Sequence, residues 1–328
     1  MQFYNLNILN FMTKMHCWQE ADQSGMCNLL KRLAPTEGFT LTSLEGVKLM
    51  RWNRSLPRSP VLYEPSIVVI CSGRKIGYLG QQVFHYNPQH FLVLSVPLPF
   101  ESETIASEHE PLMGISIRIN IPMLSELILR LDQGSSSSAP GTHGIVSTPL
   151  DAKLSNAVLR LLQALTSANE TDILGHSILR EIHYRVLTSN QGEAIRALLS
   201  QQNHLRKISK ALRKIHADFA DDLNVAKLAE ETGMSIAAFH ASFKAVTATS
   251  PMQYLKTTRL HKARMLMFQD GASAAHASAK VGYESPSQFS REFKRLFGKT
   301  PIEDLADMRA SLITLPAETA SKYVTVQP

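Results

Sequence analysis

An internal repeat in the last third of the chain constrains the fold more than any other feature. Each copy has a Gly followed by a Ser, two Phe four residues apart, a Lys, a Pro and a Leu, in that order. The first copy contains Gly233, Ser235, Phe239, Phe243, Lys244, Pro251 and Leu255. The second copy contains Gly282, Ser285, Phe289, Phe293, Lys294, Pro301 and Leu305. The Phe, Lys, Pro and Leu positions are offset by 50 residues and the Gly by 49, so the second copy has one additional residue in its turn.

Each copy has the pattern of a helix-turn-helix unit. An apolar-faced helix ends near the Gly, which tolerates the positive φ needed just after a helix. Ser235 and Ser285 are favourable N-caps, and Pro286 fits a first helical turn. Because the two Phe of a copy are four residues apart, they lie on one stripe of the second helix. The sequence therefore predicts recognition helices at about residues 235–247 and 285–297, each with one packed and one free face.

The free faces predict which residues contact DNA. We expect Arg291 to hydrogen-bond a guanine edge, and Lys244, Lys294 and Arg295 to meet phosphates. The complete predicted set is Ser235, Ala237, His240, Ala241, Lys244, Ser285, Pro286, Ser287, Gln288, Ser290, Arg291, Lys294 and Arg295.

The segment that joins the two units, Pro251–Gln269, has no internal Gly or Pro. As one helix of about 28 Å, it would place the recognition helices close to one DNA turn apart, roughly 34 Å.

The charge distribution also points to an anionic partner for this part of the chain. The chain has 34 Lys and Arg against 28 Asp and Glu, a formal net charge of +6. Residues 1–202 contain 16 basic and 16 acidic residues, so the whole excess lies in residues 203–328. A neutral module followed by a basic one is typical of a protein that binds nucleic acid with one of its parts.

Residues 38–120 predict several short strands. Ile67–Ile70 and Phe91–Val96 are apolar runs of strand length, and apolar residues alternate with polar ones in Ile115–Asn120. Alternation with a period of two is the pattern of a half-buried strand, and several such strands separated by Gly and Pro favour an antiparallel sandwich or barrel.

Beyond this region the apolar period becomes helical. Leu124, Leu127, Ile128 and Leu131 lie on one helical face, and a Ser- and Gly-rich segment at 134–141 predicts a flexible loop. Leu154–Leu165 and Ile173–Leu187 predict amphipathic helices. These two helices are expected either to cover the barrel or to pair with a second copy of the chain.

Several segments of the chain resemble the AraC/XylS family of bacterial transcription regulators. The segment Gly282–Gly298, followed by Thr300-Pro301, is similar to the second helix-turn-helix signature of that family, and Arg259–Arg264 resembles its linker-helix motif. The segments Leu33–Gly38, Pro60–Ile67 and Leu94–Glu101 resemble the β-rich N-terminal domain of one AraC-type subgroup. The resemblance implies a cupin-like effector or dimerisation domain in front of a DNA-binding domain.

The predicted fold class is α+β with two domains: an N-terminal antiparallel β cupin-like barrel with helices, and a C-terminal all-α double helix-turn-helix. The expected divisions are a lead-in at 1–35, a cupin-like effector and dimerisation domain with a helical extension at 36–190, a linker at 191–203, the AraC-type DNA-binding domain at 204–310 and a tail at 311–328. Candidate start residues are Met1, Met12, Met15 and Met26.

The first unit departs from the pattern that the resemblance implies. Ala241 stands where first-unit recognition helices often carry Arg, and Ala237 is likewise small. Ala248 stands where the family often has Gly, and Ser278 in the second unit replaces a usual Ala. We therefore expect the first unit to read bases less directly than the second, through His240 and phosphate contacts.

An enzyme whose barrel does chemistry while the C-terminal module localises it on DNA is the alternative function. The local histidines are His85, His90 and His109. The resemblance would imply an H-x-H pair with a nearby Glu in a metal-binding cupin, and no H-x-H occurs here. Glu108-His109-Glu110 has the composition of a solvated loop. A DNA-alkylation repair protein would need a cysteine cluster, but Cys17, Cys27 and Cys71 are scattered. The sequence therefore predicts no catalytic residues, no metal and no cofactor.

The expected partners are double-stranded promoter DNA, RNA polymerase, a small-molecule effector of unknown identity and a second copy in a homodimer. Candidate effector contacts are Cys71, Tyr86 and Ser95. Cys71 is either a thiol that senses an electrophile or a small buried residue.

No apolar run reaches about 18 residues, and the N-terminus lacks the pattern of a secretion signal. We therefore expect a cytoplasmic protein that associates with the nucleoid when bound to DNA.

Overall fold

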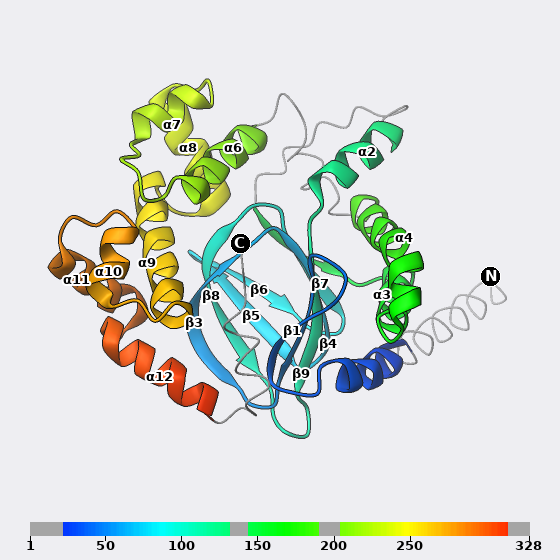
Figure 1. The fold of residues 1–328 in the computed structure, drawn as a ribbon. Coiled ribbons are helices and arrows are strands. Elements are labelled where there is room, and N and C mark those ends of the chain that lie inside the picture. The colour runs from blue at the N-terminus through cyan, green and yellow to red at the C-terminus, as the bar shows by residue number, and fades with distance from the viewer. Residues whose placement is uncertain (1–21, 132–143, 190–203, 314–328) are drawn as a thin grey trace, which may run out of the picture.

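The computed structural model describes residues 22–131, 144–189 and 204–313, and every structural statement below refers to these (Figure 1). The Ser- and Gly-rich segment at 134–141, the expected linker at 191–203 and most of the lead-in therefore lie outside the described residues.

Two antiparallel sheets form the N-terminal barrel. The six-stranded sheet has the order β1 (Gly38–Leu41), β2 (Val47–Trp52), β9 (Leu112–Arg118), β4 (Ser66–Ser72), β7 (His90–Leu94) and β10 (Ile145–Pro149). The four-stranded sheet has the order β3 (Leu56–Tyr63), β8 (Leu98–Ile105), β5 (Arg74–Leu79) and β6 (Gln82–Tyr86). This confirms the predicted antiparallel β-domain.

The position of β4 explains its continuous apolar run. It pairs with β9 on one side and β7 on the other, and residues 66–71 are all buried. One face of the strand packs into the barrel and the other under a layer of helices, so neither face can be polar. By contrast, β8 alternates between buried and half-buried residues, because one of its faces lies outside the barrel.

Helices cover the outer face of the six-stranded sheet. These are residues 22–33, α2 (Ile121–Leu131), α3 (Ala152–Ala164) and α4 (Ala168–Leu187), and their apolar faces form one core with the sheet. Asp151 caps α3 by accepting a 2.7 Å hydrogen bond from the amide of Leu154, and Ser167 caps α4. The predicted helices at 154–165 and 173–187 are thus present, and one face of each covers the barrel.

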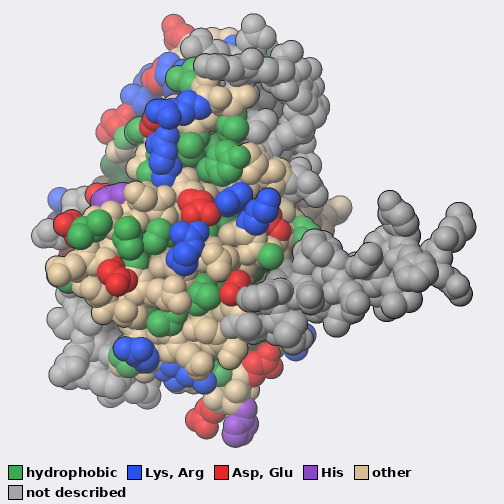
Figure 2. Space-filling model, turned by 90° about the vertical axis from the view of Figure 1, so that its right-hand side faces the viewer, with side chains coloured by type: hydrophobic (Ala, Val, Ile, Leu, Met, Phe, Trp, Pro, Cys, Tyr) green, Lys and Arg blue, Asp and Glu red, His purple; other side chains and the backbone are tan. Residues whose placement is uncertain are grey.

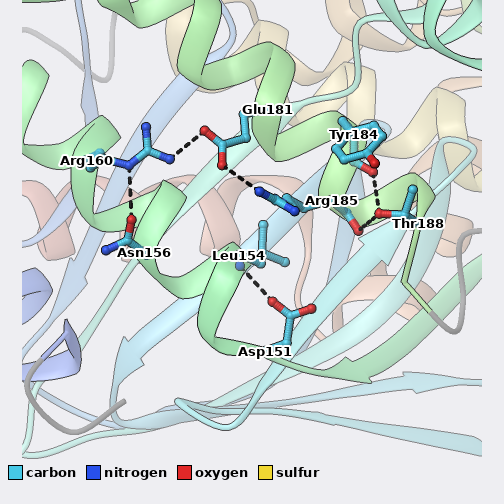
Figure 3. Close-up of polar contacts among 8 residues, drawn as sticks. All are labelled: Asp151, Leu154, Asn156, Arg160, Glu181, Tyr184, Arg185 and Thr188. Atoms are coloured by element: carbon cyan, nitrogen blue, oxygen red, sulfur yellow. Dashed lines mark hydrogen bonds and ion pairs between the residues drawn. The ribbon is translucent and has the colours of Figure 1, made fainter. Parts of the chain in front are cut away.

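Polar side chains join α3 to α4 on the outside of this layer (Figure 3). Arg160 donates one hydrogen bond to Asn156 on its own helix and another, at 2.5 Å, to Glu181 on α4. Arg185 donates to the second oxygen of Glu181 at 3.3 Å. The two arginines, Arg160 foremost, hold the pKa of the Glu181 carboxyl below its usual value. The helix pair is therefore fixed by charge as well as by its apolar core.

The C-terminal module is entirely helical and lies on the opposite side of the barrel from α3 and α4 (Figure 1). Its helices are α6 (His204–Ala217), α7 (Val225–Glu231), α8 (Ile236–Thr247), α9 (Pro251–Gln269), α10 (Ala274–Lys280), α11 (Pro286–Phe297) and α12 (Pro301–Ile313). The predicted fold class is therefore confirmed. No helix in the described part of the chain has the length and hydropathy needed to cross a membrane.

Candidate DNA interface

The two predicted helix-turn-helix units are α7 with α8 and α10 with α11. In each unit the first helix is followed by a Gly with positive φ, 60° for Gly233 and 81° for Gly282. Ser235 and Ser285 then cap the second helix, each accepting a 3.3 Å hydrogen bond from the amide three residues later. The turn chemistry read from the repeat is confirmed in both copies.

The paired Phe side chains give both units the same core. Phe239, Phe243, Phe289 and Phe293 are fully buried. The ring centroids are 5.5 Å apart in the first pair and 5.6 Å in the second, with interplanar angles of 52° and 53°. This shared packing explains why the two copies keep the spacing of the Phe while the opposite face of the helix differs.

Arg259 on α9 holds the two units together. Its guanidinium donates three hydrogen bonds to backbone carbonyls: 2.7 Å to Phe219, 2.9 Å to Asp221 and 3.1 Å to Gly282. The first two acceptors lie between α6 and α7, and the third lies in the turn of the second unit. A planar guanidinium with five donors suits this three-way contact, which a lysine could not reproduce. Arg259 therefore fixes the second turn against the first unit.

Arg264, further along α9, fixes α12. It forms a bidentate ion pair with Asp304 at 2.7 and 2.8 Å, and its guanidinium lies 4.7 Å from the centre of the Phe297 ring. The carboxylate is almost fully buried. The linker-helix motif thus supplies two arginines that brace the module, and α9 runs from Pro251 to Gln269 as expected.

The predicted DNA-contact residues lie on or directly before α8 and α11. Ser285 and Ser290 are half-buried, and the others in the predicted set are exposed or partly exposed. Within the described part of the chain, no ion pair forms on Lys244, Arg291, Lys294 or Arg295. The cationic side chains of both recognition helices are therefore exposed and not tied up in ion pairs among the described residues, although Lys294, after the hydrogen bonds with Thr300, is near enough to Glu303 to lower the pKa of its carboxyl. Direct contact of these residues with DNA stays a prediction.

A half-buried carboxylate on α11, Glu292, has contacts that could not be predicted from the sequence. Glu292 accepts hydrogen bonds from Tyr283 at 2.8 Å, Lys256 at 3.1 Å and Gln288 at 3.2 Å. Burial by itself raises the pKa of Glu292, but these hydrogen bonds bring it below its usual value. Gln288, which is in the predicted contact set, is consequently oriented by an internal partner. No spacing rule relates Lys256 on α9 to a residue on α11.

A second contact missed from sequence joins the first unit to the barrel. The Tyr254 hydroxyl on α9 donates a 2.8 Å hydrogen bond to the carbonyl of Pro97, just before β8. The ring nitrogen Nε2 of His216 lies 2.7 Å from the same hydroxyl. Burial lowers the pKa of His216 to about 4, so the imidazole is neutral near pH 7.

The apolar surroundings of Tyr254 extend this contact. Phe243, Val246 and Tyr254 of the first unit belong to the same hydrophobic cluster as Val96 and Leu98 of the barrel. The Phe pair of the second unit belongs to a separate cluster that is centred on the second half of the module. The first unit therefore shares its hydrophobic core with the barrel, whereas the second unit has a separate hydrophobic cluster and meets the barrel where α11 approaches β3.

The structure does not bring the three candidate effector contacts together. Cys71 lies on the outer side of its sheet, where its thiol contacts Met26 at 3.8 Å and burial raises its pKa. Tyr86 is buried inside the barrel with its hydroxyl 3.3 Å from Ser102. The Ser95 hydroxyl donates a 3.3 Å hydrogen bond to the carbonyl of Gly144. Cys71 and Tyr86 therefore belong to two different hydrophobic clusters, one outside the barrel and one inside it.

The three histidines considered as metal ligands do not all lie at one place. His85 and His90 line an open groove of about 590 Å³ between β6 and β10, and His109 lies in the loop between β8 and β9. Within residues 22–131, 144–189 and 204–313, no group of three or more His, Cys, Asp or Glu side chains could hold a metal ion.

Comparison with known proteins agrees with this architecture. The family model for the AraC-type transcriptional regulator N-terminus matches residues 43–194, and a helix-turn-helix domain model matches residues 228–306. The chain belongs to the AraC family of transcriptional regulators. The transcriptional activator RhaS of Escherichia coli O139:H28 is 30% identical over 100 residues, which is 30% of this chain and 36% of RhaS. The alignment thus spans about a third of that relative.

Solved structures show the same two-domain fold. ToxT of Vibrio cholerae strain SCE256, with a bound unsaturated fatty acid, has a TM-score of 0.55 at 12% identity, over 79% of this chain and 94% of ToxT. The apo form of a ToxT variant from the same strain has a TM-score of 0.57 at 11% identity, over 81% of this chain and 98% of ToxT. At these identities the likeness concerns the fold alone.

Proposed function

We propose that this AraC-family chain is a sequence-specific DNA-binding transcription regulator that reads two successive major-groove segments through α8 and α11. The observation that carries the proposal is the duplicated helix-turn-helix, whose recognition helices expose Lys244, Arg291, Lys294 and Arg295 on a module braced by Arg259. Free cations on one face of a rigid helical module suit the phosphates and base edges of a duplex.

Binding of the full-length chain to DNA from upstream of its own gene and of the adjacent gene tests this proposal. Fluorescence anisotropy at several salt concentrations gives both the affinity and its salt dependence. We expect the logarithm of the binding constant to fall linearly with the logarithm of salt concentration, with a slope of about −0.9 per phosphate contact. Absence of binding, or binding that does not respond to salt, would contradict the proposal.

We also propose that the barrel is the effector domain and that it acts on DNA binding through the first unit. The proposed divisions remain 36–190 for the effector domain, 191–203 for the linker and 204–310 for the DNA-binding domain. The shared core and the Tyr254–Pro97 hydrogen bond support this route, because a change inside the barrel meets the first unit directly. The fatty acid bound to ToxT shows that a protein of this fold accepts a small organic ligand.

A homodimer formed through α4 is the proposed assembly. Ile173 and Leu174 on the outer side of this helix are 71% and 46% exposed, beside a groove of about 360 Å³ between α3 and α4. Figure 2 shows this face, where hydrophobic side chains lie among charged ones. Such mixed surfaces with exposed aliphatic residues are typical of interfaces.

The proposed dimer is tested by sedimentation of matched variants. Leu174→Glu places a charge in the proposed interface and is expected to give a monomer. Ile302→Glu is the control, because Ile302 on α12 is 77% exposed and lies outside the interface. A wild-type monomer, or a Leu174→Glu protein that remains dimeric, would contradict this assembly.

RNA polymerase is the further proposed partner, and the proposed location is the cytoplasm with association to the nucleoid. Support comes from the similarity of the helix-turn-helix region to RhaS, which is a transcriptional activator. Transcription in vitro from a bound promoter, with and without the chain, tests the polymerase proposal.

We propose no enzyme activity for this chain. Metal analysis of the purified chain tests that proposal, since stoichiometric iron, zinc or manganese would contradict it.

A further inference from the structure

Lys75 is a charged residue buried inside the barrel. Along β5 the side chains alternate, with Lys75, Gly77 and Leu79 buried and Arg74 exposed. Lys75 is only 5% exposed and lies opposite Tyr86 on β6 and Thr104 on β8. Lysine is almost never so deeply buried unless a partner compensates its charge.

The partners that the structure gives to Lys75 are not anions. Its ammonium donates a 2.9 Å hydrogen bond to the hydroxyl of Tyr63. It also lies 5.1 Å from the centre of the Trp52 ring and 5.6 Å from that of Tyr63. Among the described residues it forms no ion pair, and one hydroxyl satisfies one of its three donors. A cation in this setting lacks a counter-charge.

The groups around Lys75 are hydroxyls. Tyr63 interacts with the hydroxyls of Ser102 and Tyr86, which lie 3.3 Å from each other, and Thr104 is buried next to them. We call Lys75, Tyr63, Tyr86, Ser102 and Thr104 the Lys75 cluster. It offers a positive charge and several hydrogen bonds on one inner face of the barrel, and contains no carboxylate.

The electrostatics of Tyr63 agree with this description. Burial by itself raises the pKa of the Tyr63 hydroxyl, but the Lys75 ammonium and the surrounding hydrogen bonds reverse that effect and leave the pKa below its usual value. The Lys75 ammonium therefore favours negative charge at Tyr63, whereas burial raises the pKa of the neighbouring Tyr86 hydroxyl.

One wall of the Lys75 cluster is apolar and reaches the surface. The rings of Trp52 and Tyr63 are half-buried, and Tyr63 packs edge-to-face on Phe100 with centroids 5.0 Å apart. The side chains between the Lys75 ammonium and the surface are therefore aromatic.

We propose that the Lys75 cluster binds the anionic group of a small organic acid whose hydrophobic part packs against Trp52, Tyr63 and Phe100. The ligand's carboxylate supplies the counter-charge that no described residue gives to Lys75, and the hydroxyls of the cluster donate to its remaining lone pairs. This inference rests on the proposed function, because it names the chemical class of the effector. It replaces Cys71 and Ser95 as effector contacts and retains Tyr86.

The test compares carboxylates with their neutral amides on the full-length chain. Trp18→Phe leaves Trp52 as the one tryptophan of the sequence, so its fluorescence reports from the Lys75 cluster. The probes are hexanoate, decanoate and phenylacetate, each paired with its amide. We expect at least one acid to bind at least tenfold more tightly than its amide. If every amide binds as well as its acid, or no acid binds, the proposal is overturned.

Substitutions on β5 locate the site. Lys75→Met keeps the length of the side chain without its charge, and is expected to weaken acid binding at least tenfold while leaving amide binding unchanged. Lys75→Arg is expected to retain most of the acid affinity. Arg74→Met is the matched control, because Arg74 is the adjacent residue on the exposed face. Equal acid binding by Lys75→Met and Arg74→Met would overturn the proposal.

Two parallel measurements separate the possible failures. A tyrosinate absorbance band at neutral pH that disappears in Tyr63→Phe would show that Tyr63 itself supplies the counter-charge, which overturns the proposal. Promoter binding by the same proteins is measured alongside. Acid binding without DNA binding would contradict the proposed function and support the Lys75 site, whereas DNA binding without acid binding would overturn the site alone.

Discussion

The two helix-turn-helix units have the same internal design but different surroundings. Both have the Gly turn, the Ser cap and the tilted Phe pair. The first unit shares its hydrophobic core with the barrel and reaches Pro97 through Tyr254. The second unit has a hydrophobic core of its own, is attached through Arg259 and Arg264, and approaches the barrel where α11 meets β3.

This difference matches the side chains on the two recognition surfaces. The first presents Ala237 and Ala241 where larger side chains could reach a groove, and the second presents Arg291 among polar residues. We infer a division of labour in which the first unit connects the effector domain to DNA and the second reads most of the sequence. On this inference, the neighbours of each copy give one duplicated motif two roles, while its own fold stays the same.

The largest expected difference between the units concerns their turn glycines. A Cβ on Gly282 would lie 2.4 Å from the carbonyl oxygen of Ala220, at a φ of +81°. Gly233, at a φ of +60°, has nothing within 4 Å of such an atom. We expect Gly282→Ala to cost roughly 3 kcal/mol or more, from backbone strain plus the clash, and Gly233→Ala about 1 kcal/mol from strain alone.

Native-state hydrogen exchange measures these two costs separately, because the amides of α8 and α11 report on different units. Equal destabilisation by both substitutions would show that the second turn is not held against the first unit as described.

A smaller effect is expected from removing one tyrosine hydroxyl in each unit. Tyr254→Phe deletes the bond to Pro97 and leaves His216 without its partner, so we expect a loss of about 1–2 kcal/mol in the first unit and in the adjoining barrel segment. Tyr283→Phe deletes the bond to Glu292 and is expected to cost about 1 kcal/mol in the second unit only. Hydrogen exchange of both variants measures the two losses. If Tyr254→Phe left the exchange of the barrel unchanged, the barrel and the first unit would not be coupled through this contact.

The smallest expected effect comes from the ends of the recognition helices. Ala248 ends α8 in the left-handed region with a φ of 58°, where Gly298 ends α11 with a φ of 77°. Ala248→Gly removes the strain and is expected to stabilise the first unit by about 0.5–1 kcal/mol, while Gly298→Ala destabilises the second by a similar amount. Urea unfolding of both variants checks the opposite signs, and a destabilised Ala248→Gly protein would contradict the assignment of strain to Ala248.

Much of this architecture could be predicted from sequence because it depends on local patterns. The turns, the caps, the Phe stripes and the span of α9 each follow from spacings of a few residues, and all agree with the structure. The apolar run of Ile67–Ile70 likewise identified a central strand.

The contacts that join distant segments could not be predicted. The bonds of Arg259 go to backbone carbonyls of Phe219, Asp221 and Gly282, which carry no side-chain signal. Lys75 could not be placed inside the barrel without the register of β5, since a shift by one residue exchanges it with Arg74. For the same reason Cys71, expected among the effector contacts, could not be assigned to the outer side of its sheet.

The division of labour is tested most directly by measuring how Arg291→Ala and Lys244→Ala bind an operator and its single-base-pair variants. We predict that Arg291→Ala loses roughly 1–3 kcal/mol of preference at one base pair beneath α11. Lys244→Ala is predicted to weaken every sequence equally, as expected for a phosphate contact. Uniform weakening by Arg291→Ala, or loss of base preference in Lys244→Ala, would contradict the assignment of base reading to the second unit.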